Sequence, residues 1–462
     1  MSAIRGRALL VVALTCFGVA PAGSRPASSP VSHNARTVRR PTPWRPPVRS
    51  VPALRPSTTS TTPSTAAPTA PSTTLAPLLE TLSPQAYLDR VLTFMQRNTA
   101  RASSVDVPAI VAAAKERGRT APDIAATYPI IRAALTALGD RHSALLDPLS
   151  AASFLRGQST GFGFRVYPPD VMWVLPGSPA EAAGMKTLDR VQSLNDKPFA
   201  QTTAADRMVA VATFAVLRNG EPLQFTVTRG ALVTAERPSV REFSGHLGYI
   251  DLPGATGDSQ AEARFVRSGL DGIGTVETAV RPCGWVLDLR RNSGGFPFSM
   301  LSVLEPFLGN GPFLGFAYGD GKRQAVAFDN GTLRVGTSKS WVNENPVRLP
   351  DQEVPIALLT SPTTASAGEA AVIGFVGRPN SRTFGEPTVG VTSANVGISL
   401  PDGAFVMVTH SYDTDRAGKL YDGPLLPDAA IITDWTTFGT GADPVLTAAQ
   451  TWLDGQPACV GR

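Results

Sequence analysis

Ser366 has the strongest chemical context in this chain of 462 residues. It stands in the run Thr-Thr-Ala-Ser-Ala-Gly-Glu at 363–369, after an apolar segment and before an alanine-rich one. That order predicts a turn from a strand into a helix, where a hydroxyl lies beside free N–H groups at the positive helix end. Nucleophiles of acyl transfer occupy such turns. A serine there can also be a plain helix cap, so both interpretations stay open.

A mostly parallel β-sheet is expected to hold this turn. Continuous apolar runs at 248–252, 284–290 and 356–360 predict buried strands with helical stretches between them. The second run leads into the polar turn Arg-Arg-Asn-Ser-Gly-Gly at 290–295. With 42% apolar and only 17% charged residues, the chain can build real cores and is no coiled coil. The predicted fold class is therefore α/β.

Two different regions precede this core. In the first, Tyr87, Val91, Leu92 and Met95 recur at helical spacing after Ser83-Pro84, and further apolar spacing predicts two more helices before the segment Gly-Asp-Arg-His-Ser at 139–143. In the second, residues 159–232 combine short strands, one small helix and glycine turns. The chain therefore carries a helical segment and a small β-rich unit before its α/β core.

The β-rich unit resembles a PDZ domain. The resemblance depends on a short glycine loop and on the helix Ser-Pro-Ala-Glu-Ala-Ala-Gly at 178–184, which follows a Val-Leu-Pro-Gly turn. It implies that backbone N–H groups of the loop bind a protein's C-terminal carboxylate while the peptide adds a strand to the sheet. The implied peptide-binding residues are Gly161, Phe162, Gly163 and Phe164. Leu188-Asp189 departs from the usual Gly-Asp turn, and a small sheet without peptide binding is the alternative.

Several motifs in order are similar to those of the C-terminal processing (tail-specific) serine proteases and the related tricorn core protease, over roughly residues 79–428. They are Asp140 to Ser143, the PDZ-like unit, Asp288 to Gly295, Thr364 to Glu369, Gly385 to Gly390, and Gly423 with Pro427-Asp428. The resemblance implies a ClpP/crotonase-like protease core with a mostly parallel sheet, an N-terminal helical segment and an inserted PDZ-like domain. It also assigns the nucleophile to Ser366.

The general base is less direct to assign. In the processing proteases it is a lysine that follows the Glu-x-Thr-x-Gly element, and here that position is Val391. Tricorn-like members pair the serine with a histidine from the segment before the PDZ unit, which matches His142. A neutral imidazole suits base catalysis near neutrality. His410 and Lys419 remain alternatives, whereas His33 lies in the predicted stalk and His246 precedes a strand.

The remaining site residues also come from the resemblance. The acid that orients the imidazole is expected near Asp422, with Asp415 and Asp140 as alternatives. Asp288 and Arg290 are expected to pair beneath the glycine turn, and Glu369 to complement the dipole of the following helix. The N–H groups that stabilise the developing oxyanion are expected from Gly294, Gly295 and Ala367.

The N-terminal segment predicts export. Arg5 and Arg7, an apolar run of about 12 residues and Ala20-Pro21-Ala22 form a cleavable signal, too short for a stable membrane span. A Pro/Ser/Thr-rich stalk of low order follows at 23–78. We expect a periplasmic, cell-wall-associated or extracellular protein, in which Cys283 and Cys459 either form a disulfide or stay unrelated.

Charge argues against nucleic acid as a partner. Residues 1–79 hold nine Arg, no Lys and no acidic residue, so the rest of the chain has a net charge of 5 − 9 = −4. A folded part that binds nucleic acid needs a clustered basic face. The expected partner is instead a protein or peptide substrate with an accessible C-terminal segment.

The predicted organisation is a signal at 1–22, a stalk at 23–78, a helical segment at 79–158, a PDZ-like domain at 159–232, a protease core at 233–440 and a tail at 441–462. The predicted function is an exported serine endopeptidase that cleaves near protein C-termini. The alternatives are a surface binding protein that has lost catalysis and an acyl or ester hydrolase with the same site. No metal and no cofactor are expected, because the chain lacks His-x-x-x-His, paired CxxC and phosphate-binding glycine motifs.

Overall fold

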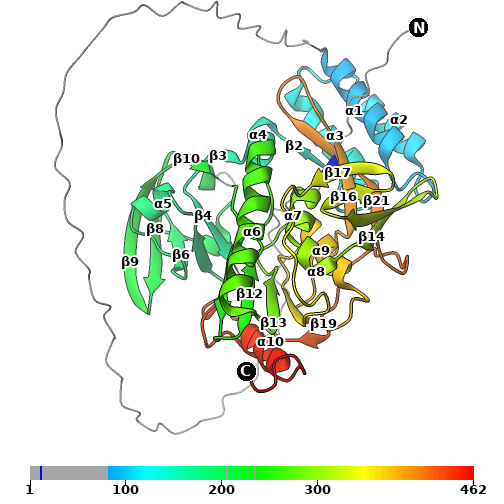
Figure 1. The fold of residues 1–462 in the computed structure, drawn as a ribbon. Helices are drawn as coiled ribbons and strands as arrows, with labels where there is room; N and C mark the ends of the chain where they lie inside the picture. Colours follow the sequence, from blue (N-terminus) through cyan, green and yellow to red (C-terminus); the bar gives the residue numbers. More distant parts are fainter. Residues whose placement is uncertain (1–10, 13–81, 168, 204–205, 234) are drawn as a thin grey trace, which may run out of the picture. The chain divides into compact units, whose positions relative to one another are not determined.

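The computed structural model describes residues 11–12, 82–167, 169–203, 206–233 and 235–462 (Figure 1). Apart from Val11–Val12, the predicted export signal lies outside these residues, and so does the predicted stalk. Among the described residues, no helix has the length and apolar character that a membrane crossing requires.

The N-terminal helical segment is confirmed as three helices. They are α1 (Pro84–Asn98), α2 (Val107–Gly118) and α3 (Tyr128–Thr136), with a 3₁₀ turn η1 (Ala125–Thr127) before α3. Ser83 caps α1 by accepting a hydrogen bond from the N–H of Ala86. The helices bury one apolar face each, as their spacing predicts, and form a common core with Val406 and Val408 of the chain's second half.

These helices pack against an antiparallel sheet. Its strands are β1 (Val11–Val12), β2 (Ala144–Leu146), β14 (Gly311–Tyr318), β15 (Arg323–Asp329), β16 (Thr332–Val335), β17 (Ser338–Val342), β20 (Ser393–Ser399) and β21 (Phe405–Asp415). The strand order is β1-β20-β21-β14-β15-β16-β17, and β2 pairs with β21. In β21, Val406 and Val408 face the helices while Phe405 and Met407 face the opposite core. At β21 the sheet is thus covered on both faces.

A second sheet carries the predicted buried strands. Its order is β11 (Ser239–Phe243), β12 (Leu247–Asp251), β13 (Gly284–Asp288), β18 (Ile356–Thr360), β19 (Ser381–Gly385) and β22 (Ala429–Ala430). The neighbours from β12 to β22 pair in parallel, and β11 joins β12 antiparallel. Helices α7 (Pro297–Val303), α8 (Glu305–Leu308) and α9 (Ala367–Phe375) connect or flank these strands.

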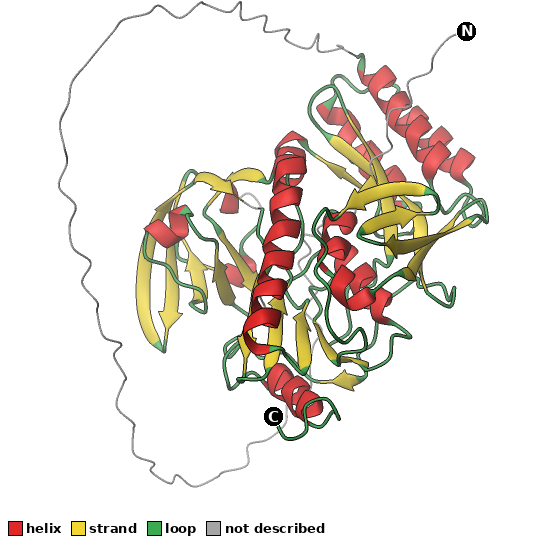
Figure 2. Cartoon of the chain, in the orientation of Figure 1, coloured by secondary structure: helices red, strands yellow, loops and turns green. Residues whose placement is uncertain are grey.

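Helices on both faces explain the continuous apolar runs of this sheet. Helix α6 (Ser259–Val280), the long helix at the centre of Figure 2, shares a core with Leu287 and Leu358. Helix α10 (Pro444–Asp454) packs on the other face, against Val286 and Ala357. Successive side chains of a strand point to opposite faces, so both sets must be apolar.

The prediction of a mostly parallel sheet needs correction. Among the described residues, parallel pairing occurs only between neighbours in the order β12-β13-β18-β19-β22 of the second sheet. The other strand pairs in this part of the chain are antiparallel. The reason is the short connections from β14 to β17, since strands joined by tight turns become antiparallel neighbours. The core is therefore a mixed α/β structure built on two sheets.

The β-rich unit forms a separate small sheet. Its order is β4 (Phe164–Tyr167), β5 (Val171–Val174), β6 (Arg190–Leu194), β8 (Val211–Arg218) and β9 (Glu221–Thr228), all antiparallel, with β7 (Lys197–Pro198) beside β6. The ribbon β3 (Gln158–Gly161) and β10 (Gly230–Val233) joins it to α4 (Pro148–Arg156) and the core. The predicted short helix is α5 (Pro179–Ala182), capped by Ser178. We call residues 158–233 the small-sheet unit.

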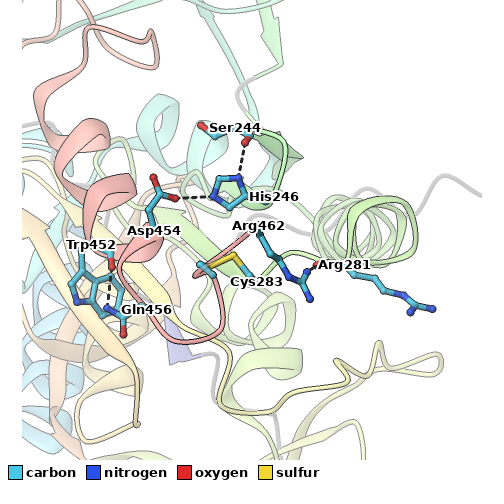
Figure 3. Close-up of a disulfide and its surroundings, with 9 residues drawn as sticks. Ser244, His246, Arg281, Cys283, Trp452, Asp454, Gln456 and Arg462 are labelled. Carbon is cyan, nitrogen blue, oxygen red and sulfur yellow. Dashed lines mark hydrogen bonds and ion pairs between the residues drawn. A yellow bond between two sulfur atoms is a disulfide. The ribbon is translucent and has the colours of Figure 1, made fainter.

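Cys283 and Cys459 form a disulfide (Figure 3). Cys283 directly precedes β13, and Cys459 follows α10. Next to it, His246 Nε2 lies 2.7 Å from Asp454 Oδ1. The chain beyond the last helix is thus bonded to the start of a central strand, and the pairing that the sequence left open is resolved.

Candidate active site

Ser366 lies on the turn between β18 and α9, as predicted, with unusual geometry. Its φ is 55° and its ψ is −117°, a conformation that costs energy for a residue with a Cβ. The residue is 1% exposed, and its Oγ has no hydrogen-bond partner among the described residues. A serine whose role is capping would use this oxygen to accept a helix N–H. The turn instead holds a buried, unsatisfied hydroxyl.

Glu369, the third residue of α9, stands in the capping-box position relative to Ser366. Its carboxylate accepts the N–H of Ser366 at 2.8 Å, of Gly390 at 2.7 Å and of Val391 at 2.9 Å, and also the hydroxyl of Thr388. Burial raises the pKa of Glu369, while these four donors favour its ionised form and act in the opposite direction. One carboxylate therefore joins the serine turn to residues 388–393, which we call the 388–393 loop.

A second buried acid lies beside this carboxylate. Asp413 of β21 is 1% exposed, its Oδ2 has no hydrogen-bond partner among the described residues, and its N–H donates to the carbonyl of Thr392. Burial and the neighbouring charge of Glu369 raise the pKa of Asp413 well above its usual value. Sequence reasoning missed this residue, since an acid inside a strand carries no local signal of its surroundings.

His142 reaches the same loop from the turn between α3 and β2. It is fully buried, and its Nδ1 lies 2.7 Å from the Oγ of Ser393. The neighbouring Arg141 donates from Nη2 to the carbonyl of Gly390 at 3.0 Å. Burial lowers the pKa of His142 to about 4, although the charge of Asp140 acts in the opposite direction. The imidazole is therefore neutral at physiological pH and lies at the loop that Glu369 connects to Ser366.

The predicted acids lie in three different settings. Asp140 accepts the N–H groups of His142 at 3.0 Å and of Ser143 at 2.8 Å, so its carboxylate shapes the histidine turn. Asp415 accepts the hydroxyl of Tyr421 and two backbone N–H groups. Asp422 is exposed. The hydrogen bond described for the imidazole Nδ1 goes to a serine, and the assignment of Asp422 stays a prediction.

The two alternative bases lie in other surroundings. His410 lies within β21, which continues to Asp415. Its Nδ1 lies 2.9 Å from the carbonyl oxygen of Asn98, and its ring packs edge-on against Tyr318. The Nζ of Lys419 lies 5.0 Å from the ring centre of Tyr421. No described contact joins either side chain to Ser366 or to the 388–393 loop.

The glycine turn at 290–295 follows β13 and packs against the serine turn. Gly294 and Gly295 have φ values of 98° and 123°, and a Cβ on Gly295 would lie 1.9 Å from the carbonyl oxygen of Ala255. The N–H of Gly294 donates to Asn292 Oδ1 at 2.9 Å. Among the described residues, the N–H groups of Gly295 and Ala367 have no acceptor. Two of the three predicted oxyanion donors are thus available, and Gly294 is engaged.

Asn292 organises this pair of turns, a role that sequence reasoning did not assign. Its Nδ2 donates to the carbonyl of Leu252 at 2.9 Å, and its own carbonyl accepts the N–H of Ala365 at 3.0 Å. A Cβ on Gly368 would lie 2.8 Å from its Oδ1. The sequence does carry a signal for this role of Asn292, because it is an asparagine that directly follows a buried strand in a glycine-rich turn.

A family comparison agrees with this geometry. The model of peptidase family S41 matches residues 246–431, which include Ser366, the serine turn and the glycine turn. This part, about two fifths of the chain, is similar to peptidase family S41. His142 and the small-sheet unit precede the matched residues.

Two relatives resemble parts of the chain. The nisin-resistance protein of Lactococcus lactis is 31% identical over 191 residues, which cover 40% of this chain and 57% of that protein. The chloroplastic carboxyl-terminal-processing peptidase 2 of Arabidopsis thaliana is 26% identical over 333 residues, 65% of this chain and 60% of that protein. The chain thus spans a little over half the length of these relatives.

A solved structure has a similar fold. The crystal structure of a candidate S41 protease from Bacteroides fragilis superposes with a TM-score of 0.56 at 17% identity, covering 79% of this chain and 97% of that one. This likeness concerns the fold alone.

A buried ion network lies beneath the glycine turn. Arg290 is fully buried and bonds to Asp288 at 2.6 Å and to Asp443 at 2.8 Å. The expected pairing of Asp288 with Arg290 is present, and Asp443, the cap of α10, is an addition from beyond the S41 match. The network fixes the end of β13, from which the glycine turn starts.

The predicted peptide-binding loop is closely packed. Gly161 pairs with Gly230 in the ribbon, and the carbonyl of Phe162 accepts the N–H of Ala180 at 2.8 Å. A Cβ on Gly163 would lie 2.2 Å from the Cβ of Ser178, so the loop requires glycine there for its contact with α5. Phe164 begins β4, the edge strand of the small sheet. Within the described ranges, no group of three or more His, Cys, Asp or Glu side chains is arranged to hold a metal ion.

Proposed function

We propose that this chain is an exported serine endopeptidase that hydrolyses peptide bonds near protein C-termini, with Ser366 as nucleophile and His142 as general base. The buried, unpartnered Oγ of Ser366 carries this proposal. It stands on a turn with a φ of 55°, beside the available N–H groups of Gly295 and Ala367. Leaving a hydroxyl buried and unpaired on a strained turn costs stability, and such costs are concentrated at functional sites.

The chemistry follows from these groups. Ser366 Oγ bonds to the carbonyl carbon of the substrate while its proton passes to the imidazole of His142. The oxyanion receives hydrogen bonds from Gly295 and Ala367, and the proton then moves to the leaving amine as the peptide bond breaks. Water releases the acyl group by the same steps in reverse order, with His142 again accepting the proton.

Substrate choice is proposed to come from the small-sheet unit acting as a PDZ-like domain. Its edge strand β4 has no further strand beyond it in the sheet, so a peptide could extend the sheet there. The glycine-dependent loop at 161–164 leads directly into this strand. The name of the Arabidopsis relative refers to carboxyl-terminal processing, which is consistent with such recognition.

Export is supported by two independent features. The first residues have the pattern of a cleavable signal. Cys283 and Cys459 form a disulfide, and disulfides persist mainly in oxidising compartments. A periplasmic, cell-wall or extracellular location follows from the proposal.

Fluorophosphonate labelling of the full chain tests the site. We expect wild type to be labelled, and Ser366→Ala and His142→Ala to be labelled at least about a hundredfold more slowly. Ser302→Ala is a matched control, because Ser302 is equally buried with an unpartnered hydroxyl but lies in α7. His410→Ala tests the alternative base. Folded wild type that neither reacts nor cleaves peptides would overturn the proposal.

One observation favours a second candidate, a surface binding protein that has lost catalysis. Val391 occupies the position of the lysine base of the processing proteases, is 3% exposed, and binds Glu369 only through its N–H. The loop is therefore apolar where that chemistry would need an amine. Absence of labelling together with retained binding of C-terminal peptides would support this candidate.

A further inference from the structure

The contact between His142 and Ser393 has a specific chemical consequence. His142 Nδ1 and Ser393 Oγ are 2.7 Å apart, and the two residues are 0% and 6% exposed. The carbonyl of His142 also accepts the Nδ2–H of Asn395 at 3.2 Å. Side chains at the start of β20 therefore hold both the ring and the backbone of this histidine.

A hydroxyl can bond to an imidazole nitrogen in two ways. If Ser393 donates its proton to Nδ1, the neutral ring carries its own proton on Nε2 and that nitrogen cannot accept another. If Nδ1–H donates to Ser393 Oγ, the lone pair lies on Nε2, which then acts as the base. In Ser-His-Asp sites an aspartate enforces the second arrangement.

We propose that Ser393 is the positioning residue of His142 and takes the place of the triad acid: its Oγ accepts the Nδ1–H and directs proton acceptance to Nε2. This inference rests on the proposed function. It accounts for a site in which the expected acid, Asp422, is exposed while the imidazole Nδ1 is bonded to a neutral hydroxyl.

Most charged groups described around His142 are bonded elsewhere, which agrees with a neutral hydroxyl as the partner of its Nδ1. Asp140 acts on the ring through its charge, but its carboxylate oxygens accept backbone and hydroxyl hydrogens of its own turn. Arg141 binds the carbonyl of Gly390. The carboxyl groups of Glu369 and Asp413 belong to elements bonded to residues 388–392 of the loop. A neutral hydroxyl does little to stabilise the imidazolium that forms during catalysis, so a carboxylate at position 393 should raise the pKa of the ring.

Three variants of Ser393 test the proposal. Ser393→Ala is expected to lower kcat at least about tenfold with KM within about twofold, because the ring loses its orienting acceptor but not its substrate contacts. Ser393→Thr keeps the hydroxyl and should restore most of kcat. Ser393→Asp should move the acidic limb of the pH profile upward by about one unit or more. Ser411→Ala, a buried serine of the neighbouring strand β21, is the matched control.

Nitrogen-15 NMR of histidine-labelled full chain gives a readout that needs no activity, since the chain has only four histidines. We expect the His142 signals of wild type to show a protonated Nδ1 and an unprotonated Nε2, and Ser393→Ala to change this pattern while Ser411→Ala does not. A proton on Nε2 in wild type, or an alanine variant with unchanged kcat, pH profile and spectrum, would overturn the inference. Wild type that is inert to fluorophosphonate and peptides, with the expected spectrum, would overturn the proposed function alone.

Discussion

The guanidinium carbon of Arg291 lies 3.6 Å from the centre of the Trp173 ring. Arg291 belongs to the glycine turn, and Trp173 belongs to β5 of the small-sheet unit. The same guanidinium pairs with Glu236 at 3.1 Å and Asp251 at 2.5 Å. Burial disfavours its charge, but these two carboxylates outweigh burial and raise the pKa of Arg291. One side chain thus connects the candidate oxyanion turn to the unit proposed to bind peptides.

Replacing Trp173 should weaken this connection. We expect Trp173→Ala to lower the free energy of unfolding by roughly 2 kcal/mol, from the lost cation–π contact and apolar burial, and to lower kcat. Urea unfolding and peptide hydrolysis provide the two measurements. Trp452→Ala, which removes an indole packed on Phe384 instead, should lower stability without the same loss of kcat. Equal effects of the two variants on kcat would contradict the role of the Arg291 contact.

The acidic limb of the activity profile should lie unusually low. Burial lowers the pKa of His142 to about 4, and the neutral ring is the proposed base, so we expect activity above this pKa and its loss below it. We expect kcat/KM to be nearly constant from pH 7 to about pH 5 and to fall with an apparent pKa near 4. An acidic limb near pH 6.5, the ordinary histidine value, would contradict the buried setting of the base.

The buried carboxyl group of Asp413 should lower the free energy of unfolding at neutral pH. Its pKa is raised in the folded protein, so its stabilising contribution is complete below the unfolded pKa of about 4 and is lost as the pH rises towards the folded value. Asp413→Asn should therefore raise the free energy of unfolding at pH 7 by about 1–3 kcal/mol, with little effect near pH 3.

Urea unfolding at both pH values measures this difference. Asp422→Asn serves as the exposed counterpart and should change stability little at either pH. An asparagine variant that is less stable than wild type at pH 7 would show that the ionised carboxylate of Asp413 is stabilising, against the prediction.

Reduction of the disulfide should destabilise the core. Cys283 and Cys459 are separated by 176 residues, and in the chain-entropy model a disulfide that closes so long a loop stabilises the fold by about 5 kcal/mol. We expect a double alanine variant to lose about 2–5 kcal/mol of unfolding free energy and to become insensitive to dithiothreitol. Cys16→Ala should behave as wild type in both respects. A double variant with unchanged stability would mean that α10 and Asp443 hold the C-terminal segment without the disulfide.

Local patterns in the sequence predicted the elements that carry the site. The spacing of Tyr87, Val91 and Met95 indicated α1, and the apolar runs around Val286 and Leu358 indicated strands covered on both faces. These elements can be predicted from the sequence because the spacing of apolar residues follows the period of the helix or strand whose side chains are buried. The serine turn was readable for the same reason, since its order of strand, polar turn and small-residue helix is continuous in the chain.

Local patterns in the chain therefore predicted the set of elements and the position of Ser366 between two of them. The contacts between distant residues came from the folded structure: Ser393 against His142, 251 residues away, Asp413 beside Glu369, and the hydrogen bond of Gly294 to Asn292. It also decided that the strands after Gly311 form an antiparallel sheet, and that the two cysteines meet. These relationships depend on how distant segments pack, and a polar residue carries no local mark of whether its neighbour in space is a donor, a charge or water.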